Sequence, residues 1–425
     1  MCKHRTLFIL FVLIFCVLQT VLAGEKPKAH LGGALRFNYN YSDWKEGNKH
    51  RGGDFGFDVF RINVNASWKK IRLDAEYRFY ARTSGGGMLK YGWVGYQFND
   101  NHVLQLGQNT VPFGAMPFNS NNYFFSINYY LGLEDDADMG LKYCFRKKGW
   151  ELDAAFYKNA DLLDFSEGVE TSDSRYAYDI AGRNKEVNQG NLRVAYNWGE
   201  RWKHQIGASA MYGGIYNLDT EKMGSRYAFA IHYTLNWKRW NLKAQYTTYK
   251  FSPENKEDEP RNQITMTAYG APYEIAAHAD TYTASLCYTF PIDKGILDEI
   301  RLYNDFSMMH KRKAGFNDSF QNITGCMLGM GPVLVYVDYA LGKNQPWLGN
   351  DWNEAFTSAT LEKGWNARLN VNIGYYFNKS VDKYINLTNR LLRRFYRGFS
   401  NDLENVRNSL LCVIILSNNP CQKQR

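Results

Sequence analysis

Apolar and polar residues alternate along most of this chain of 425 residues, and the alternation recurs in segments of about ten residues. In the stretch NARLNVNIGYYF, from Asn366 to Phe377, every second residue is apolar or aromatic, and those between are polar or glycine. A period of two residues predicts an extended strand with one apolar and one polar face. Such a strand lines either the core of a sandwich or the wall of a barrel. Sixteen segments of this kind are predicted, at about 30–41, 57–68, 71–81, 89–98, 102–109, 139–146, 150–158, 190–198, 204–213, 227–237, 240–249, 279–290, 299–308, 321–330, 333–341 and 367–377.

Two short turns test this interpretation, because a two-residue turn fixes which residues of the flanking strands pair. A hairpin centred on Lys69-Lys70 places only apolar pairs on one face and only polar pairs on the other. A hairpin centred on Lys238-Arg239 gives the same division. In the first hairpin the apolar pairs are Trp68 with Ile71, Ala66 with Leu73, Val64 with Ala75, Ile62 with Tyr77 and Phe60 with Phe79, and the polar pairs are Ser67 with Arg72, Asn65 with Asp74, Asn63 with Glu76 and Arg61 with Arg78.

Connection lengths and aromatic placement favour a membrane barrel over a periplasmic or extracellular sandwich. Short connections such as Gly331-Pro332 alternate with mostly longer ones such as 110–138, 159–189 and 250–278. Short turns on one rim, long loops on the other and an even strand number are typical of outer-membrane barrels, as is an aromatic girdle. The aromatic residues beside the short turns are Trp68, Trp198, Trp237, Trp240 and Phe290. We therefore expect an all-β fold, a transmembrane antiparallel barrel of sixteen strands with short periplasmic turns and long extracellular loops.

The ends of the chain differ from the predicted barrel. Residues 1–23 have basic residues, the apolar run LFILFVLIFCVL and small residues before Gly24, which is the pattern of a signal peptide. The barrel is expected over 24–377, ending on the aromatic Phe377. Residues 378–425 lose the alternation and form a basic C-terminal tail, interpreted either as a basic amphipathic segment or as an extension without selected structure.

Net charge and cysteine content indicate neither nucleic-acid binding nor a disulfide framework. Of the formal charge of +9, the signal segment contributes +2 and the tail +6, so residues 24–377 carry only +1. The basic balance is therefore no indication of nucleic-acid binding. Three cysteines remain between the signal segment and the tail, Cys144, Cys287 and Cys326, and we expect free thiols because they are odd in number and lie on separate strands.

The lumen of a sixteen-stranded barrel is too wide for wall side chains to fill, so we expect a water-filled channel. The aromatic connection 110–138 has no Lys or Arg and is the candidate for a loop that narrows it. Its acids face a predicted basic wall, and this suggests a transverse field through which small polar solutes pass. Two other interpretations stay open: the acids form a solvated rim or bind a structural cation, and Glu76 and Asp74 neutralise the wall arginines. The candidate pore-lining residues are Arg36, Arg61, Arg78 and Arg368 on the wall and Glu134, Asp135, Asp136 and Asp138 at the end of the loop.

Three stretches resemble the phosphate-selective porin O and P family, especially its diverged members from Bacteroidetes-type bacteria. They are VLQLGQNTVPFGA (103–115), IRLYNDFS (300–307) and VLVYVDYALGKN (333–344), within a likeness that covers most of 30–377. The resemblance implies a homotrimeric porin of the bacterial outer membrane, in contact with its lipids and read by its assembly machinery at a final aromatic residue such as Phe377. Family members that bind phosphate line the constriction with basic residues, whereas loop 110–138 has none, so general diffusion is favoured over phosphate selectivity. Carbohydrates and an anion preference from the wall arginines stay open.

The competing classes are a barrel hydrolase and a pure anchor or adhesin. The sequence lacks GxSxG, HExxH and GxxxxGK motifs, which weakens the case for an enzyme. His232 is expected to face inward beside Gln245 without an acid to orient it. An anchor or adhesin favours longer loops than these. No cofactor or metal is expected, and the partners are small hydrophilic solutes or inorganic ions.

Overall fold

The computed structural model describes residues 27–160, 172–359 and 364–380. The predicted signal peptide and the part of the predicted tail after residue 380 lie outside the described residues. Leu31–Asn378 form one compact unit, and the second unit, Met1–His30 with Lys379–Arg425, falls almost wholly outside the described residues.

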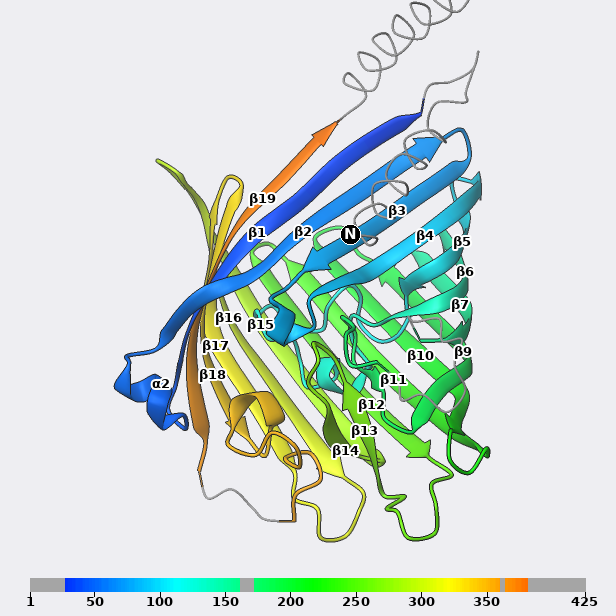
Figure 1. The fold of residues 1–425 in the computed structure, drawn as a ribbon. Helices are drawn as coiled ribbons and strands as arrows, with labels where there is room; N and C mark the ends of the chain where they lie inside the picture. Colours follow the sequence, from blue (N-terminus) through cyan, green and yellow to red (C-terminus); the bar gives the residue numbers. More distant parts are fainter. Residues whose placement is uncertain (1–26, 161–171, 360–363, 381–425) are drawn as a thin grey trace, which may run out of the picture. The chain divides into compact units, whose positions relative to one another are not determined.

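Sixteen antiparallel strands close into a barrel, which confirms the predicted fold (Figure 1). Neighbouring strands along the chain are neighbours around the barrel, apart from the inserted short strands, and β1 lies beside β19 to close the ring. Each of the sixteen predicted segments overlaps one barrel strand, and the last strand runs three residues beyond the predicted stop at Phe377. The barrel strands are β1 (Lys28–Ser42), β2 (Asp54–Trp68), β3 (Ile71–Phe79), β4 (Gly87–Asn99), β5 (His102–Thr110), β6 (Ala137–Lys147), β7 (Trp150–Asn159), β9 (Asn184–Trp198), β10 (Trp202–Asn217), β11 (Met223–Trp237), β12 (Trp240–Ser252), β15 (His278–Lys294), β16 (Leu297–Lys311), β17 (Ser319–Met330), β18 (Val333–Lys343) and β19 (Asn366–Ser380).

The strand registers agree with the hairpin predictions. Trp68 pairs with Ile71 and every further pair of that hairpin is as predicted, up to Phe60 with Phe79. The hairpin of β11 and β12 likewise pairs Trp237 with Trp240. The apolar members of the first hairpin are exposed or half-buried, while Glu76 and Arg78 on the opposite face are buried within the barrel. Alternation alone therefore decides which side chains reach the interior.

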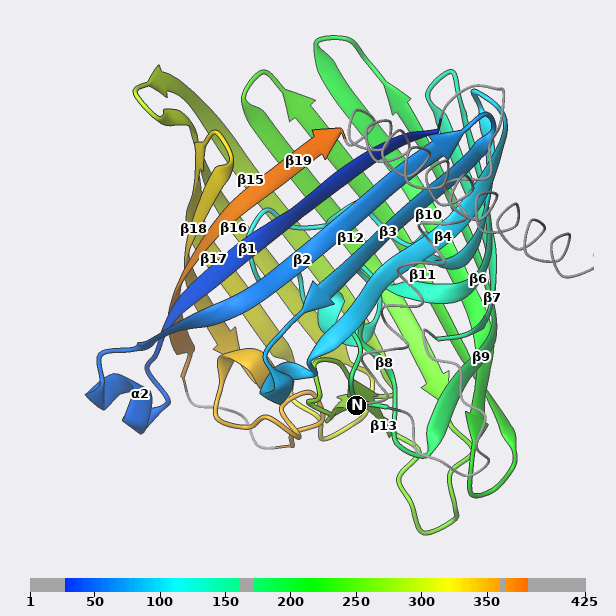
Figure 2. The same cartoon turned by 45° about the horizontal axis from the view of Figure 1, so that its top comes forward.

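Long loops lie on one rim, and several of them turn into the barrel (Figure 2). Three strands within two of these loops form a small antiparallel sheet in the order β14–β13–β8, here called the inner sheet: β8 (Asp179–Ile180), β13 (Gln263–Thr267) and β14 (Tyr273–Ala276). The sequence analysis assigned these segments to loops. Buried apolar residues of the inner sheet pack with inward-facing residues of β7, β10, β11, β12, β15 and β16. The remaining short elements are α2 (Glu46–His50), η1 (Arg82–Ser84), η2 (Tyr129–Leu131) and η3 (Pro346–Leu348).

Two smaller findings complete the fold. Cys144, Cys287 and Cys326 are free cysteines, as predicted. Among the described residues, none of the helices has the length and apolar character to cross a membrane.

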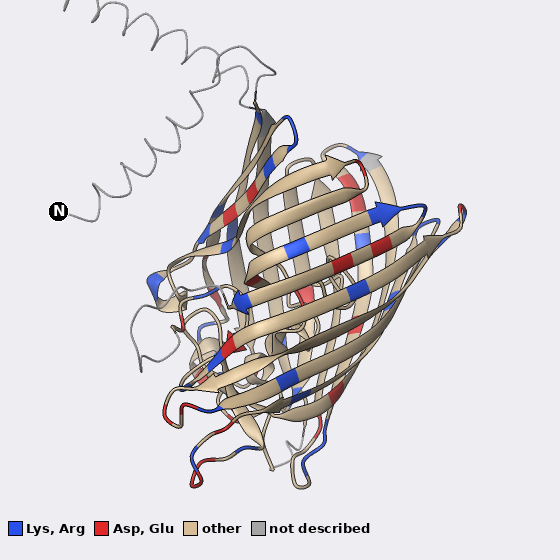
Figure 3. Ribbon diagram, turned by 90° about the vertical axis from the view of Figure 1, so that its right-hand side faces the viewer, with Lys and Arg blue, Asp and Glu red and all other residues tan. Residues whose placement is uncertain are grey.

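Many large apolar residues of the strands are exposed. Charged residues are frequent in the long loops and are scattered along the strands (Figure 3). Leu106 on β5 is paired with Val94 and Leu141 on the two neighbouring strands, and the three side chains are 64%, 52% and 43% exposed. An apolar patch of this kind, repeated around a closed barrel, matches the lipid-facing band of a membrane barrel.

We predict that Leu106→Arg destabilises the folded barrel in lipid bilayers by about 2–4 kcal/mol, because a charge on the lipid face near the midplane must leave water. Urea unfolding in lipid vesicles measures the change. Asp100→Arg, in the short turn between β4 and β5, is the control and is expected to leave stability within about 0.5 kcal/mol. An equally small effect of Leu106→Arg would contradict the membrane assignment of this face.

Candidate functional site

The segment between β5 and β6, residues 111–136, folds into the barrel and is here called the inner loop. Its first turn is fixed to the wall at Gly114, whose N–H donates to Ser209 Oγ at 3.0 Å and whose carbonyl accepts from Arg193 Nε at 2.9 Å. Gly114 has a φ of +64°, and an added Cβ would lie 2.5 Å from the amide of Gln245. Glycine is required here by both the backbone conformation and the close approach.

The middle of the inner loop is held by Asp305 on β16. Its carboxylate accepts from the N–H groups of Asn121 and Asn122, both at 2.8 Å, and from the Asn122 side chain at 2.6 Å. Two residues along the same strand, Ser307 Oγ accepts from the N–H of Ile127 at 3.3 Å. Both anchors lie in the stretch IRLYNDFS, so two polar residues of that stretch bind the loop.

Further contacts follow the loop around the wall from β12 to β1. Lys243 on β12 donates to the carbonyl of Ser120 at 2.8 Å, and Gln321 on β17 donates to the carbonyl of Phe125 at 2.8 Å. At the far side, Asn38 on β1 donates to the hydroxyl of Tyr123 at 2.9 Å. The loop is therefore anchored to strands over a large part of the barrel wall.

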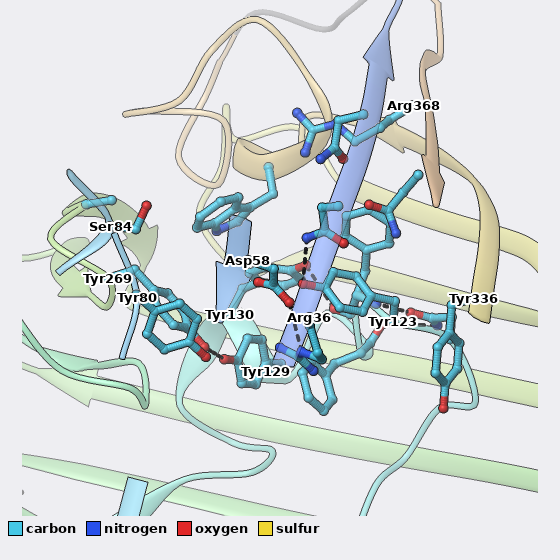
Figure 4. A pocket seen from close by; sticks show the side chains of 18 of the residues that line it. Arg36, Asp58, Tyr80, Ser84, Tyr123, Tyr129, Tyr130, Tyr269, Tyr336 and Arg368 are labelled. Atoms are coloured by element: carbon cyan, nitrogen blue, oxygen red, sulfur yellow. Dashed lines mark hydrogen bonds and ion pairs between the residues drawn. The ribbon is translucent and has the colours of Figure 1, made fainter. Parts of the chain in front are cut away.

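The space that the inner loop leaves beside β19 and β1–β4 is a cavity of about 1120 Å³ (Figure 4). Basic side chains from five adjacent strands line one side, and aromatic residues of loops line the other. We call the basic side the basic wall. Its members are Arg368 on β19, Arg36 on β1, Arg61 on β2, Arg78 on β3 and Lys90 on β4.

Most of the basic wall is paired with acids. Arg36 Nε lies 2.8 Å from Asp58, and Arg78 Nε lies 2.5 Å from Glu76. The second oxygen of Glu76 lies 3.6 Å from Arg61, so this one carboxylate separates the two arginines that face each other across the hairpin. This supports the interpretation that Glu76 neutralises them.

Asp74, the other acid proposed to neutralise the arginines, instead accepts from Asn65 at 2.6 Å.

Arg368 is the member of the basic wall without an ion pair among the described residues. It donates to Ser42 Oγ at 2.9 Å, and its guanidinium lies 4.9 Å from the centre of the Trp44 ring. Within the basic wall, five cations therefore face three paired acids, Asp58, Glu76 and Asp135, which leaves a formal charge of +2.

The loop side of the cavity is aromatic. Tyr123 stacks against Arg36 at 5.5 Å, and the hydroxyls of Tyr129 and Tyr269 hydrogen-bond each other. Burial raises the pKa of all three phenols, so they stay neutral and serve as polar but uncharged walls. Figure 4 shows their rings gathered near Arg36 and Asp58, with Arg368 farther along the wall.

The four acids predicted to form one charged rim are separated by the structure. Asp135 reaches the cavity, where its carboxylate binds Lys90 at 2.7 Å and Tyr176 at 2.6 Å. Glu134 is turned into the inner loop and accepts from the N–H of Asn119 at 2.8 Å. Burial raises the pKa of Glu134.

Asp136 and Asp138 are also absent from the cavity lining, and both lie near Asp179 of the inner sheet. Burial, followed by the charge of Asp138, raises the pKa of Asp136. A transverse field built from all four acids therefore does not describe this cavity, since only Asp135 lines it and Lys90 neutralises it.

The predicted pore-lining residues did not include Lys90 or the aromatic residues that line the cavity. Lys90 is an inward-facing residue of a correctly predicted strand, so its period-two position was a usable signal. Tyr123 gave no such signal, because its contact with Arg36 joins a loop to a strand 87 residues earlier. His232, expected to line the lumen, contacts Gln205 at 3.3 Å, and its Nδ1 has no hydrogen-bond partner among the described residues.

Comparisons with known proteins identify the fold. No protein-family model and no curated protein matches the chain. Among solved structures, OmpT, an outer membrane protein of Vibrio cholerae in its trimer form, is 14% identical with a TM-score of 0.53, over 83% of this chain and 99% of that one. The outer membrane channel DcaP of Acinetobacter baumannii is 13% identical with a TM-score of 0.53, over 84% and 100%. An anion-selective porin from Comamonas acidovorans is 13% identical with a TM-score of 0.50, over 83% and 100%.

At these identities the likeness establishes the fold alone, a closed barrel of outer-membrane type. Both this fold and the apolar outer face agree with the predicted outer-membrane location.

We predict that Asp305→Ala loosens the inner loop, because it leaves the half-buried N–H of Asn121 and the buried N–H of Asn122 without their acceptor, at about 1–3 kcal/mol for the buried group. Limited proteolysis should then cut the loop faster while the barrel strands stay protected. Asp258→Ala removes an exposed carboxylate from the loop after β12 and serves as the control. Equal cleavage rates in the two variants would show that Asp305 does not hold the loop.

Proposed function

We propose that the chain is a porin of the bacterial outer membrane, which lets small hydrophilic solutes or ions diffuse through its lumen with a preference for anions. The observation that carries the proposal is the cavity inside a closed barrel with an apolar outer face, bounded by a basic wall of net charge +2. Small anions are the solutes that such a wall attracts.

The candidate pore-lining residues divide into two groups in this proposal. The first group faces the passing solute and consists of Arg36, Arg61, Arg78 and Arg368, together with Lys90. Asp135 offsets part of their positive charge. Glu134 instead shapes the loop that narrows the passage.

Phosphate selectivity is not part of the proposal, because most wall cations already have carboxylate partners. Phosphate would have to compete with Asp58 and Glu76 for the same donors.

Two further parts of the proposal concern assembly. Residues 1–23 serve as the export signal, and the chain assembles as a homotrimer, as the resemblance to the phosphate-selective porin family implies. The trimer form described for the Vibrio cholerae protein of the same fold is consistent with this.

We predict that Arg368→Gln lowers the anion-to-cation permeability ratio about two- to fivefold. Arg368 is the wall cation without a carboxylate partner, and a unit charge about 4 Å from a permeating ion contributes about 1 kcal/mol in water. Salt screening brings the effect toward the lower value. The zero-current potential of the purified protein in a planar bilayer under a salt gradient measures the ratio.

Arg201→Gln is the control for this measurement, because it removes the same charge from an exposed position in the short turn between β9 and β10. Cation preference in the unmodified protein would overturn the role of the basic wall. If the correctly folded protein gave no conductance in the bilayer, the porin proposal would be overturned, and an anchor or a barrel hydrolase would be favoured.

A further inference from the structure

Three carboxylates meet in the barrel interior away from the cavity and form what we call the carboxylate cluster. Asp136 ends the inner loop, Asp138 lies on β6 and Asp179 lies on β8 of the inner sheet. One oxygen atom of each lies within 4.8 Å of the others, and the residues are only 3%, 1% and 0% exposed. Buried carboxylates at this distance repel one another, so the cluster requires a compensating positive charge or proton.

Within the part of the chain that the structure describes, Asp136 and Gln189 each place a buried oxygen atom at the cluster without a hydrogen-bond partner. Asp136 Oδ1 accepts from the N–H of Ala137 at 2.7 Å, but Asp136 Oδ2 has no partner. Gln189 on β9 is 2% exposed, and its Nε2 donates to Asp138 at 3.2 Å while its Oε1 has no partner. The amide of Gln189 is thus held against the cluster, and a half-turn about its last bond exchanges Nε2 for a neutral oxygen ligand.

Asp136 is the member of the cluster that has no ion pair among the described residues. Arg175 lies 2.8 Å from Asp179, and Arg226 forms a close ion pair with Glu186 on β9. Neither guanidinium group is paired with Asp136.

We propose that the carboxylate cluster binds one divalent cation of the calcium class, with Asp136, Asp138 and Asp179 as charged ligands and Gln189 as a neutral one. The donor set consists of oxygen atoms alone, which suits a hard cation rather than a transition metal. Ca²⁺ accepts an irregular set of six to eight oxygen ligands, whereas Mg²⁺ demands a near-ideal octahedron. The site is independent of the proposed porin function.

The position of the site gives the cation a structural consequence. Its ligands come from the end of the inner loop, from the barrel wall at β6 and β9, and from the inner sheet. A bound cation therefore joins three separate segments and fixes the end of the inner loop opposite to its anchor at Gly114.

The test uses the full barrel refolded in detergent without lipopolysaccharide, so that no lipid phosphate competes for calcium. After treatment with EDTA, equilibrium dialysis against radioactive Ca²⁺ is expected to show one tightly bound ion per chain. Asp136→Asn, a change of nearly equal size, is expected to weaken this binding at least about tenfold. Asp258→Asn removes an exposed carboxylate and is the matched control, with binding unchanged.

A second measurement keeps the proposal falsifiable if a variant folds poorly. In the unmodified protein, Ca²⁺ is expected to raise the temperature of barrel unfolding and to slow proteolysis of the inner loop, and EDTA to reverse both. Absence of tight binding in the unmodified protein would overturn the site and assign a proton to Asp136 instead. Binding that is equally tight in Asp136→Asn would overturn it as well, because it would place the ion elsewhere.

Discussion

The closed ring of backbone hydrogen bonds is the constraint on which the rest of this structure depends. In hydrocarbon an unpaired N–H or C=O costs several kcal/mol, so a sheet crosses a membrane only when its first and last strands pair. Here β1 is hydrogen-bonded to β19, and the sixteen strands form a closed sheet. Closure at this number makes a lumen too wide for wall side chains to fill. The lumen must therefore be occupied either by water or by other segments of the chain.

In this protein, loop segments fill part of the lumen and leave a cavity in another part. The inner loop and the inner sheet pack against the side formed by β7, β10–β12, β15 and β16, where buried aromatic and aliphatic residues make a core. Polar side chains on the same strands anchor the loop, as Asp305 and Ser307 do. The polar side chains that face inward thus have two roles. On one side of the barrel they bind the backbone of the inner loop, and beside β19 and β1–β4 they face the cavity.

The barrel was predictable from the sequence, while the contents of its lumen were only partly so. Period-two alternation identified all sixteen strands, and two-residue turns gave the pairing of Arg61 with Arg78. Both signals are local. The contacts of the inner loop are not, since Asn121 and Asp305 lie 184 residues apart. The inner sheet was missed because its strands are too short for alternation to separate them from irregular chain.

The acidic residues at the end of the inner loop show that composition alone does not predict where side chains point, because the backbone conformation determines their directions. Four acids between residues 134 and 138 read as one negative surface, yet their carboxylates enter three environments. Asp135 has a φ of +53°, a left-handed conformation that aspartate tolerates, and its side chain points to Lys90 rather than to its neighbours. Glu134 and Asp136, on either side of it, are directed into the loop and into the carboxylate cluster. One turn of the backbone thus removes most of the negative charge from the cavity, and this is why the basic wall dominates the field there.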